Sequence, residues 1–270
     1  MAIPDLQTLP SVPLPDTLDP PSPVVIERVR PEIDAGRYPV KRVQGDILEV
    51  SADIFKEGHD KIAAVLKYRR KDEEEWREAE MRFVDNDRWA GQFLVPDNTR
   101  YVYTIEAFPD RWATWADEIG KKLDAGQDVA LELLEGRAII AEALPRADAD
   151  DREILEQGIA AIDGEGVQAA TVRILLAPEV EAAMRRVRSR RGKAVYDTEL
   201  QVVVDRPAAR FAAWYEMFPR SAGTDPTRGA TLVEAANRLP AIAEMGFDVV
   251  YLTPIHPIGR AFRKGKNNTL

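Results

Sequence analysis

The feature of this sequence that most constrains its fold is a hydrophobic period that changes twice along the chain. Up to about residue 110, apolar and polar residues alternate in short runs, and this period of two favours β-strands. From Arg111 the apolar spacing becomes three or four, which is typical of amphipathic helices. After Gly192 the alternating pattern returns. The sequence therefore predicts a helical segment placed between two strand-forming segments.

The first segment, residues 24–110, predicts a β-sandwich. Six runs rich in β-branched and aromatic residues are separated by turn sequences such as "DND" and "PDNT". In the last run, the side chains of Tyr101, Tyr103 and Ile105 alternate with those of Val102, Thr104 and Glu106, as in a strand. Together with the returning run at residues 194–206, these strands predict a sandwich of immunoglobulin-like size.

Residues 111–193 predict an inserted bundle of antiparallel helices. Asp150 and Asp151 provide cap signals for the third helix. We expect the apolar helix faces to pack within the bundle, including Leu131, Leu134, Ala138, Ile154 and Ile159. A basic run ends the last helix, where cations complement the helix dipole, so we interpret it as a solvated surface and not as a nucleic-acid patch. This run contains Arg185, Arg186, Arg188, Arg190, Arg191 and Lys193.

A third pattern begins near residue 207. The runs "FAAWYEMF", "TLVEAANRLPAIAEM" and "FDVVYL" predict a strand, a helix and a strand, which form one βαβ unit with parallel strands. We expect Gly246 to follow the end of the helix, and Pro240 to kink or restart it. The predicted apolar stripe of this helix contains Leu232, Ala236, Leu239 and Ala243.

Composition narrows the class of protein. Lys and Arg total 37 against 46 Asp and Glu, a net charge of −9, which argues against general binding to nucleic acid or membrane surfaces. The chain has no Cys and two His, so neither a disulfide nor a transition-metal site is expected. Residues 1–23 contain seven prolines and predict a disordered tail. Without a signal-like segment, the expected location is the cytoplasm.

The loop after the last predicted strand is the candidate binding site. It contains His256, Lys264, Asn267 and Asn268, at the carboxyl end of a parallel strand, where α/β folds place ligand contacts. Amide and ammonium groups there suit sugar hydroxyls or a phosphate. An ordinary exposed connection has the same composition, so composition leaves both interpretations open.

Longer strings give a resemblance. "AWYEMFPRSAG" and "LPAIAEMGFDVVYLTPIHPIGRAFRKGKNNTL" resemble the opening of the catalytic barrel of the α-amylase superfamily, glycoside hydrolase family 13. The second string is similar to one branch, the α-1,4-glucan:maltose-1-phosphate maltosyltransferases. "VVIERVRPEIDAGRYPVKRVQGD", "EGHDKIAAVLKYR" and "WATWADEIGKKLDAGQDV" resemble the N-terminal part of that family. The similarity covers about residues 24–270.

The resemblance implies four segments and an activity. The segments are a tail at 1–23, a β-sandwich domain at 24–110 plus 194–206, an inserted helical bundle at 111–193, and the start of a (β/α)₈ TIM barrel at 207–270. The implied activity is a retaining transfer of maltosyl units from maltose 1-phosphate to the non-reducing end of α-1,4-glucan. The resemblance implies a homodimer and no cofactor.

The resemblance also implies which residues contact substrate. Lys264 matches a donor-contacting position, with His256, Asn267 and Asn268 as its neighbours in the site. The catalytic carboxylates are expected beyond residue 270, so no catalytic residue is assigned here. Two alternatives remain: another hydrolase or branching enzyme of the superfamily, and a non-catalytic fragment that binds glucan or mediates dimerisation.

Overall fold

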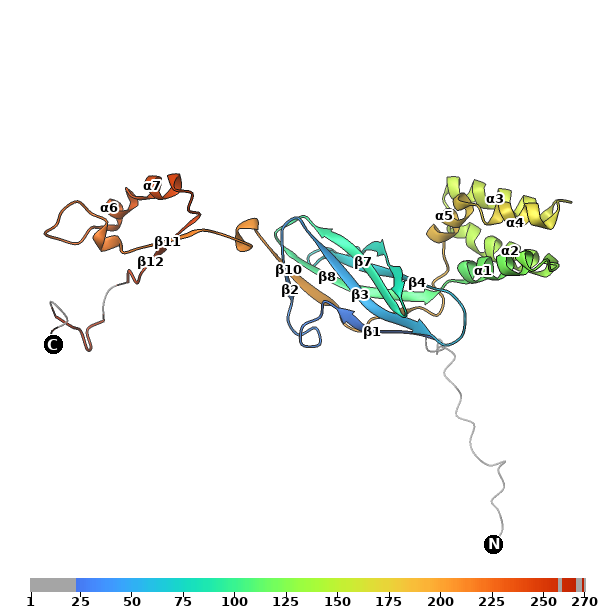
Figure 1. Cartoon of the computed structure of the whole chain (residues 1–270), viewed down its shortest axis with the longest axis horizontal. Helices are drawn as coiled ribbons and strands as arrows, with labels where there is room; N and C mark the ends of the chain where they lie inside the picture. Colours follow the sequence, from blue (N-terminus) through green and yellow to red (C-terminus); the bar gives the residue numbers. More distant parts are fainter. Residues whose placement is uncertain (1–22, 257–258, 266–268, 270) are drawn as a thin grey trace, which may run out of the picture. The chain divides into compact units, whose positions relative to one another are not determined.

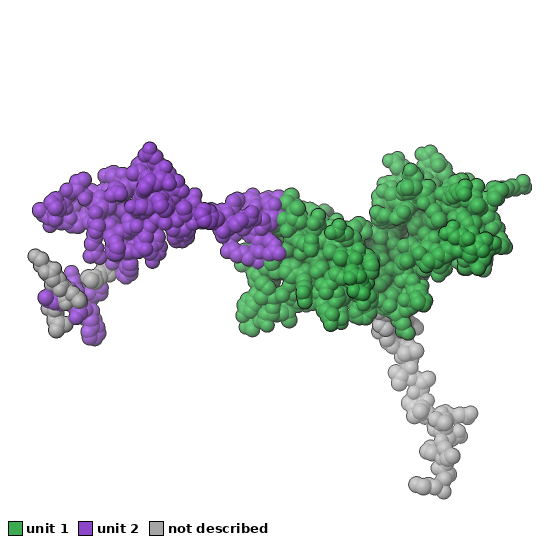
Figure 2. Space-filling view, in the orientation of Figure 1, with its two compact units in different colours: residues 1–40, 47–95, 100–203 green, residues 41–46, 96–99, 204–270 purple. Residues whose placement is uncertain are grey.

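The computed structural model describes residues 23–256, 259–265 and 269. Two compact units, coloured differently in Figure 2, are described here one at a time. Of the described residues, the first unit comprises 23–40, 47–95 and 100–203, and the second comprises 41–46, 96–99, 204–256, 259–265 and 269. Of the predicted tail at residues 1–23, only Pro23 lies within the described residues. Among these described residues, no helix combines the length and apolar character needed to cross a bilayer.

Two β-sheets form much of the first unit (Figure 1). The smaller sheet has the strand order β1–β3–β7–β6, formed by Val24–Arg30, Asp46–Lys56, Arg88–Val95 and Arg82–Asp85. Strand β3 alternates as a half-buried strand should, because its buried apolar side chains fall at every second position. These side chains are Leu48, Val50, Ala52 and Ile54.

The larger sheet has the order β2–β10–β8–β4–β5, formed by Val40–Val43, Leu200–Asp205, Arg100–Pro109, Ile62–Arg70 and Arg77–Glu80. A short strand, β9 (Ala194–Val195), also pairs with β8. The two sheets pack through aromatic side chains. Phe93 of β7 stacks on Tyr68 of β4 with ring centroids 4.3 Å apart, and it also contacts Tyr101 and Tyr103 of β8.

The six predicted strand runs form eight strands. A turn at Gly45, where φ is +87°, separates β2 from β3 within one predicted run. The run "EWREAEMRFV" divides at Met81: β5 before it pairs with β4 of the larger sheet, and β6 after it pairs with β7 of the smaller sheet. A period of two shows which side chains share a face but not which strand becomes the partner, so the sequence pattern did not reveal this change of sheet.

Strand β8 differs from the expected alternation because both of its faces are buried. Tyr103 and Ile105 lie on the face that packs against the smaller sheet. Thr104 and Glu106 lie on the opposite face and are also buried, at 5% and 1% exposure. The segment at residues 187–196 covers this second face, where the Thr104 hydroxyl donates to the carbonyl of Tyr196 at 3.0 Å. Contacts with a segment distant in the sequence therefore bury the second face of this strand as well.

Five helices lie between β8 and β9 in the sequence, as the helical period predicts (Figure 1). Asp110 caps the first helix by accepting from the Ala113 N–H at 2.9 Å. The third helix is capped by Asp148, and the predicted cap residues Asp150 and Asp151 lie in its first turn. The helices are α1 (Arg111–Asp124), α2 (Ala130–Ala143), α3 (Ala149–Asp163), α4 (Gln168–Leu175) and α5 (Pro178–Arg186).

The predicted core face of α2 is wrong. Leu131 and Leu134 are 66% and 61% exposed and Ala138 is also exposed, whereas Leu133 is buried. Gly136 explains the rotation, because a Cβ there would overlap the ring of Trp115 from α1, so the helices approach closely on this side. The sequence offers two leucine stripes on α2, and contact with α1 selects the one through Leu133. Ile154 and Ile159 are partly buried against the helical core, as expected.

The second unit contains the predicted βαβ arrangement. Strands β11 (Trp214–Met217) and β12 (Val249–Leu252) pair in parallel. Between them lie two short helices, α6 (Leu232–Ala236) and α7 (Leu239–Glu244). The helix therefore restarts at Leu239, with Pro240 in its first turn, and Gly246 follows it with φ of +87°. Short elements η2 (Leu144–Arg146), η3 (Pro207–Ala209) and η4 (Pro219–Ser221) are 3₁₀ turns.

The predicted apolar stripe of the helix between β11 and β12 is wrong. Leu232 and Leu239 are 55% and 45% exposed, and the buried side chains are Ala235 and Ile242. The restart at Leu239 changes the phase between the two helical turns, so one continuous stripe does not describe both.

Candidate functional site

The predicted binding loop follows the carboxyl end of β12. Two of its four predicted residues are described: His256 and Lys264 are both exposed, and neither forms an ion pair with another described residue. The other two, Asn267 and Asn268, lie outside the described residues. Within this loop the Gly265 N–H donates to the carbonyl of Thr269 at 2.6 Å. The substrate-binding role of these four residues therefore remains a prediction.

The carboxylate nearest this loop in the sequence, Asp248, has a structural partner. Its Oδ2 accepts from the Ala213 N–H at 2.9 Å, and its own N–H donates to the Ala213 carbonyl at 2.9 Å. These bonds fasten the start of β12 beside the start of β11. Asp248 thus helps to set the parallel pair from which the loop emerges.

A capping box at the start of α6 fixes the helix between the two strands. Thr231 and Glu234 satisfy each other's backbone N–H groups, and the Arg228 guanidinium donates to both carboxylate oxygens of Glu234. The Arg228 hydrogen bonds, followed by those from Thr231, lower the pKa of Glu234 to about 2. Glu234 is therefore ionised throughout the neutral range.

The basic run that ends α5 is solvated only in part. Four of its residues are exposed as expected, but Arg188 and Arg190 are half-buried and belong to an ion-paired clamp; the exposed residues are Arg185, Arg186, Arg191 and Lys193. Arg190 donates to Glu106 Oε1 at 2.7 Å and Lys193 to Glu106 Oε2 at 3.0 Å. Burial of Glu106 raises its pKa, but the hydrogen bonds from Lys193 and Arg190 outweigh burial, so the pKa lies below its usual value. Arg190 also pairs with both carboxylate oxygens of Glu78. These contacts hold the segment after the helices against β5 and β8.

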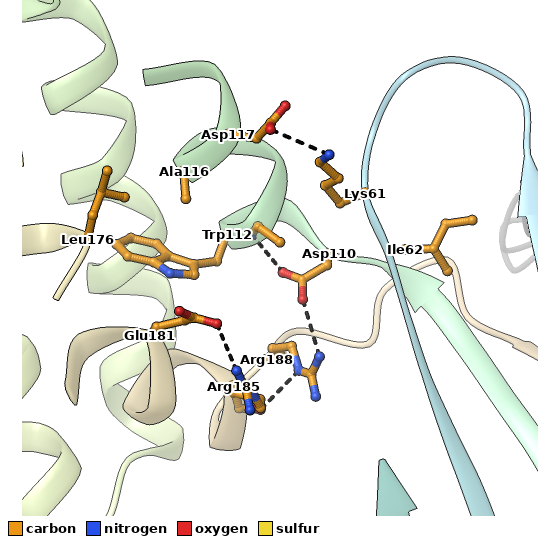
Figure 3. A pocket seen from close by; sticks show the side chains of 11 residues that line it. Lys61, Ile62, Asp110, Trp112, Ala116, Asp117, Leu176, Glu181, Arg185 and Arg188 are labelled. Atoms are coloured by element: carbon orange, nitrogen blue, oxygen red, sulfur yellow. Dashed lines mark hydrogen bonds and ion pairs between the residues drawn. The ribbon is translucent and has the colours of Figure 1, made fainter. Parts of the chain in front are cut away.

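A cavity of about 390 Å³ opens beside this clamp, within the first unit (Figure 3). The start of α1 forms one wall with Trp112, Ala113 and Ala116, and Leu176 and Ile62 add apolar surface. Asp110 positions α1 because it caps the helix and also accepts from Arg188 at 3.3 Å.

Charged side chains of both signs surround the apolar wall. Three cations line the cavity and each has an acidic neighbour: Arg188 with Asp110, Lys61 with Asp117 at 3.5 Å, and Arg185 with Glu181 at 2.7 Å. A hydrogen bond from Lys121 lowers the pKa of Asp117, which therefore remains a carboxylate at neutral pH. The lining offers hydrogen-bond donors and acceptors with balanced charge.

Sequence reasoning did not find this cavity. Its residues come from the start of β4, from α1, and from the segment between α4 and β9, so no local spacing unites them. One weak sequence signal could have indicated the cavity. Ala113 and Ala116 follow Trp112 on α1, at positions where a helix packed in a core would carry larger side chains. Among the residues that the structure describes, no group of His, Cys, Asp and Glu side chains has the arrangement of a metal site.

Comparison with known protein families matches more than half of the chain to one family. Residues 22–206 match the family described as "Alpha-1,4-glucan:maltose-1-phosphate maltosyltransferase, domain N/S". The chain belongs to this family, as the sequence resemblance indicated.

Individual relatives carry the same description. A protein of Myxococcus xanthus named alpha-1,4-glucan:maltose-1-phosphate maltosyltransferase is 47% identical over 255 residues, covering 92% of this chain and 38% of the relative. Proteins of the same name from Chlorobaculum tepidum and Rhodospirillum rubrum are 45% and 41% identical over 92% and 95% of this chain, and 37% and 39% of their own length. The chain thus spans less than two fifths of the length of these relatives.

Proposed function

We propose that the protein carrying this chain transfers maltosyl units from maltose 1-phosphate to the non-reducing end of α-1,4-glucan and releases phosphate. The observation that supports this is sequence identity of 41–47%, over at least 92% of the chain, to relatives whose name contains that donor and acceptor. Identity at this level extends beyond the matched domain family, since residues 22–206 are only part of the aligned length.

The reaction is a double displacement in this proposal. A carboxylate attacks the anomeric carbon, and the bond from that carbon to the phosphate oxygen breaks, so that phosphate leaves. A glucan 4-hydroxyl then attacks the same carbon, a general base takes the hydroxyl proton, and the carboxylate is released.

Two finer features of the fold belong to the same proposal. The parallel pair β11 and β12, with helices between them, supports the assignment of residues 207–270 to the start of a (β/α)₈ barrel. The two packed sheets support an immunoglobulin-like sandwich at residues 24–110 plus 194–206, with residues 111–193 as its helical insertion.

The substrate-binding loop is also proposed to act at the donor sugar. His256 and Lys264 follow a parallel strand on the side where barrel enzymes bind substrate, and both are exposed and available to a ligand. A cytoplasmic location is part of the proposal because the relatives are named for sugar-phosphate metabolism.

We further propose a homodimer, formed through the β-rich part and the outer surface of the helices. The sequence placed Leu131 and Leu134 in the bundle core and so outside any dimer contact, but both are exposed and that reason no longer holds. Cross-links between subunits that map wholly to residues 207–270 would contradict this surface.

The test of function uses the full-length protein with maltose 1-phosphate and a maltooligosaccharide acceptor. Phosphate release should require the acceptor, and products should grow by two glucose units at a time. Release of free maltose without acceptor growth would instead indicate a hydrolase, and new α-1,6 linkages would indicate a branching enzyme. Acceptor binding without turnover would favour the non-catalytic alternative.

A further inference from the structure

The cavity beside α1 has a hydrogen-bond donor in its lining, the indole N–H of Trp112. Trp112 and Trp115 are neighbours with ring centroids 4.5 Å apart, and they are 5% and 4% exposed. The indole N–H of Trp115 donates to the carbonyl of Glu132 at 2.6 Å. Among the described residues, the indole N–H of Trp112 has no acceptor, and the one fully buried side-chain donor without a partner is Arg69 Nε, so the Trp112 N–H is accessible from the cavity. An accessible indole N–H can donate to the oxygen of a molecule that enters the cavity.

Figure 3 shows where the indole ring of Trp112 lies. In Figure 3 the Trp112 ring projects into the cavity between Leu176 and Glu181, away from the sheet. A molecule in the cavity would therefore meet an aromatic ring with a free N–H, and a carboxylate of Glu181 on the neighbouring helix. The ring provides apolar contact, and a hydrogen bond from the N–H fixes the orientation of the bound molecule.

The charge of the lining selects the class of molecule. The cations Lys61, Arg185 and Arg188 are matched one to one by Asp110, Asp117 and Glu181, so the lining has no net charge. An anion such as a sugar phosphate would gain little here, because each cation already has an anionic neighbour. A neutral molecule with many hydroxyl groups, in contrast, finds both donors and acceptors around an apolar wall.

The size of the cavity fits a small ligand. Its volume of about 390 Å³ lies within the range of roughly 300–1,000 Å³ that small-molecule sites occupy. The space exists because Ala113 and Ala116 carry only methyl groups on the helix face beside Trp112. A larger side chain at Ala116 would enter it.

We propose that this cavity binds a neutral carbohydrate, a short stretch of α-1,4-glucan, with Trp112 as the central contact. The ligand class rests on the proposed function, since the relatives are named for α-1,4-glucan as a substrate. In this arrangement the sugar contacts the accessible edge of the indole ring, and a hydroxyl oxygen accepts from its N–H. Glu181 and Asp117 accept from other hydroxyl groups, and Lys61 and Arg185 donate to them.

The test titrates maltotetraose into the 270-residue chain and follows binding by calorimetry and by NMR of the indole N–H groups. The chain has five tryptophans, and the Trp112 resonance is identified as the one missing in Trp112→Phe. It should shift on titration. Trp112→Phe keeps an aromatic ring but loses the donor, and should weaken binding about three- to tenfold.

Two alanine variants form a matched pair. Ala116→Leu fills the cavity and should weaken binding by about tenfold or more. Ala138→Leu adds the same group at an exposed position of α2 and should leave binding unchanged. If Ala116→Leu fails to fold, as judged by circular dichroism, the Trp112→Phe result decides.

Several results would overturn the proposal. One is no binding of maltotetraose by the wild-type chain, which would leave only water at the Trp112 N–H. Another is equal binding by the wild type, Ala116→Leu and Trp112→Phe. A third is a stronger shift of the Trp112 resonance by maltose 1-phosphate or inorganic phosphate than by maltotetraose, since that would show an anion site. Each leaves the proposed transfer reaction unaffected, because that reaction is tested separately by phosphate release.

Discussion

Lys264 is the residue on which the proposed donor contact depends most. It is exposed in the loop that follows β12 and has no ion-pair partner among the described residues, so its ammonium is free to meet a ligand. We expect Lys264→Ala in the full-length enzyme to remove a charge-assisted hydrogen bond of roughly 1.5–3 kcal/mol. This corresponds to a loss of about ten- to more than a hundredfold in kcat/KM for maltose 1-phosphate.

The matched control is Lys266→Ala, which should retain nearly wild-type activity. Steady-state phosphate release by the two variants provides the measurement. Equal, near-wild-type kcat/KM for both would show that Lys264 does not contact the donor.

Glu106 is the residue that holds the ionic clamp together. It is 1% exposed, accepts from both Arg190 and Lys193 and lies 3.7 Å from the Lys67 ammonium, so its neutralisation leaves three cations without their buried partner. We expect Glu106→Gln to lower the free energy of unfolding by about 3 kcal/mol. Glu78→Gln, which removes a more exposed partner of Arg190, should cost about 1 kcal/mol or less.

Urea denaturation of the two Glu→Gln variants measures both values. Similar midpoints for Glu106→Gln and Glu78→Gln would mean that burial of Glu106 adds nothing to the clamp.

At the scale of elements, the start of α6 depends on an ionised Glu234. Its pKa falls from 4.5 to about 2 on folding, mainly through hydrogen bonds from Arg228. Because the folded pKa is the lower one, this contribution to stability is complete above about pH 4.5 and is lost as the pH falls toward 2. Hydrogen exchange of the α6 amides should therefore become faster across this interval.

Glu234→Gln provides the comparison, because it removes the titrating group while retaining an amide oxygen that accepts hydrogen bonds. The exchange rates of its α6 amides, corrected for intrinsic chemistry, should show no additional acid-dependent step. An identical step in the variant would assign it to another carboxyl group.

Helix α2 offers a direct test of which of its faces is the core. Leu133 is 8% exposed and Leu134 is 61% exposed, although they are adjacent and chemically identical. We expect Leu133→Ala to lower the free energy of unfolding by about 2–4 kcal/mol, and Leu134→Ala to change it by less than about 0.5 kcal/mol. Thermal or urea unfolding of the two variants decides between the two stripes; a larger loss for Leu134→Ala would favour the face predicted from sequence.

At the scale of the whole molecule, this chain by itself should release no phosphate from maltose 1-phosphate. Retaining transfer needs two carboxyl groups about 5 Å apart across the scissile bond. In the segment that leads to the donor loop, Asp248 accepts from the Ala213 N–H and fastens two strands. A phosphate-release assay with the 270-residue chain, beside the full-length protein as a positive control, measures this. Turnover that rises in proportion to the concentration of the purified chain would contradict it.

The sequence by itself determined the local elements and the family. The helices of residues 111–193, the parallel βαβ unit, the restart beside Pro240 and the turn after Gly246 all follow from patterns within a few residues. Such patterns report backbone preference and the existence of an apolar face, because neighbours at three, four or two positions set both. The quoted strings then identified the family that residues 22–206 match.

Only the tertiary structure decided which faces are covered. Met81 divides one predicted strand between two sheets, contact with Trp115 selects the Leu133 face of α2, and residues 187–196 bury the second face of β8. The Arg190–Glu106 pair joins residues 84 positions apart, and the Trp112 cavity combines three segments. Burial and ion pairing depend on which distant segment arrives, and local periodicity contains no record of that partner.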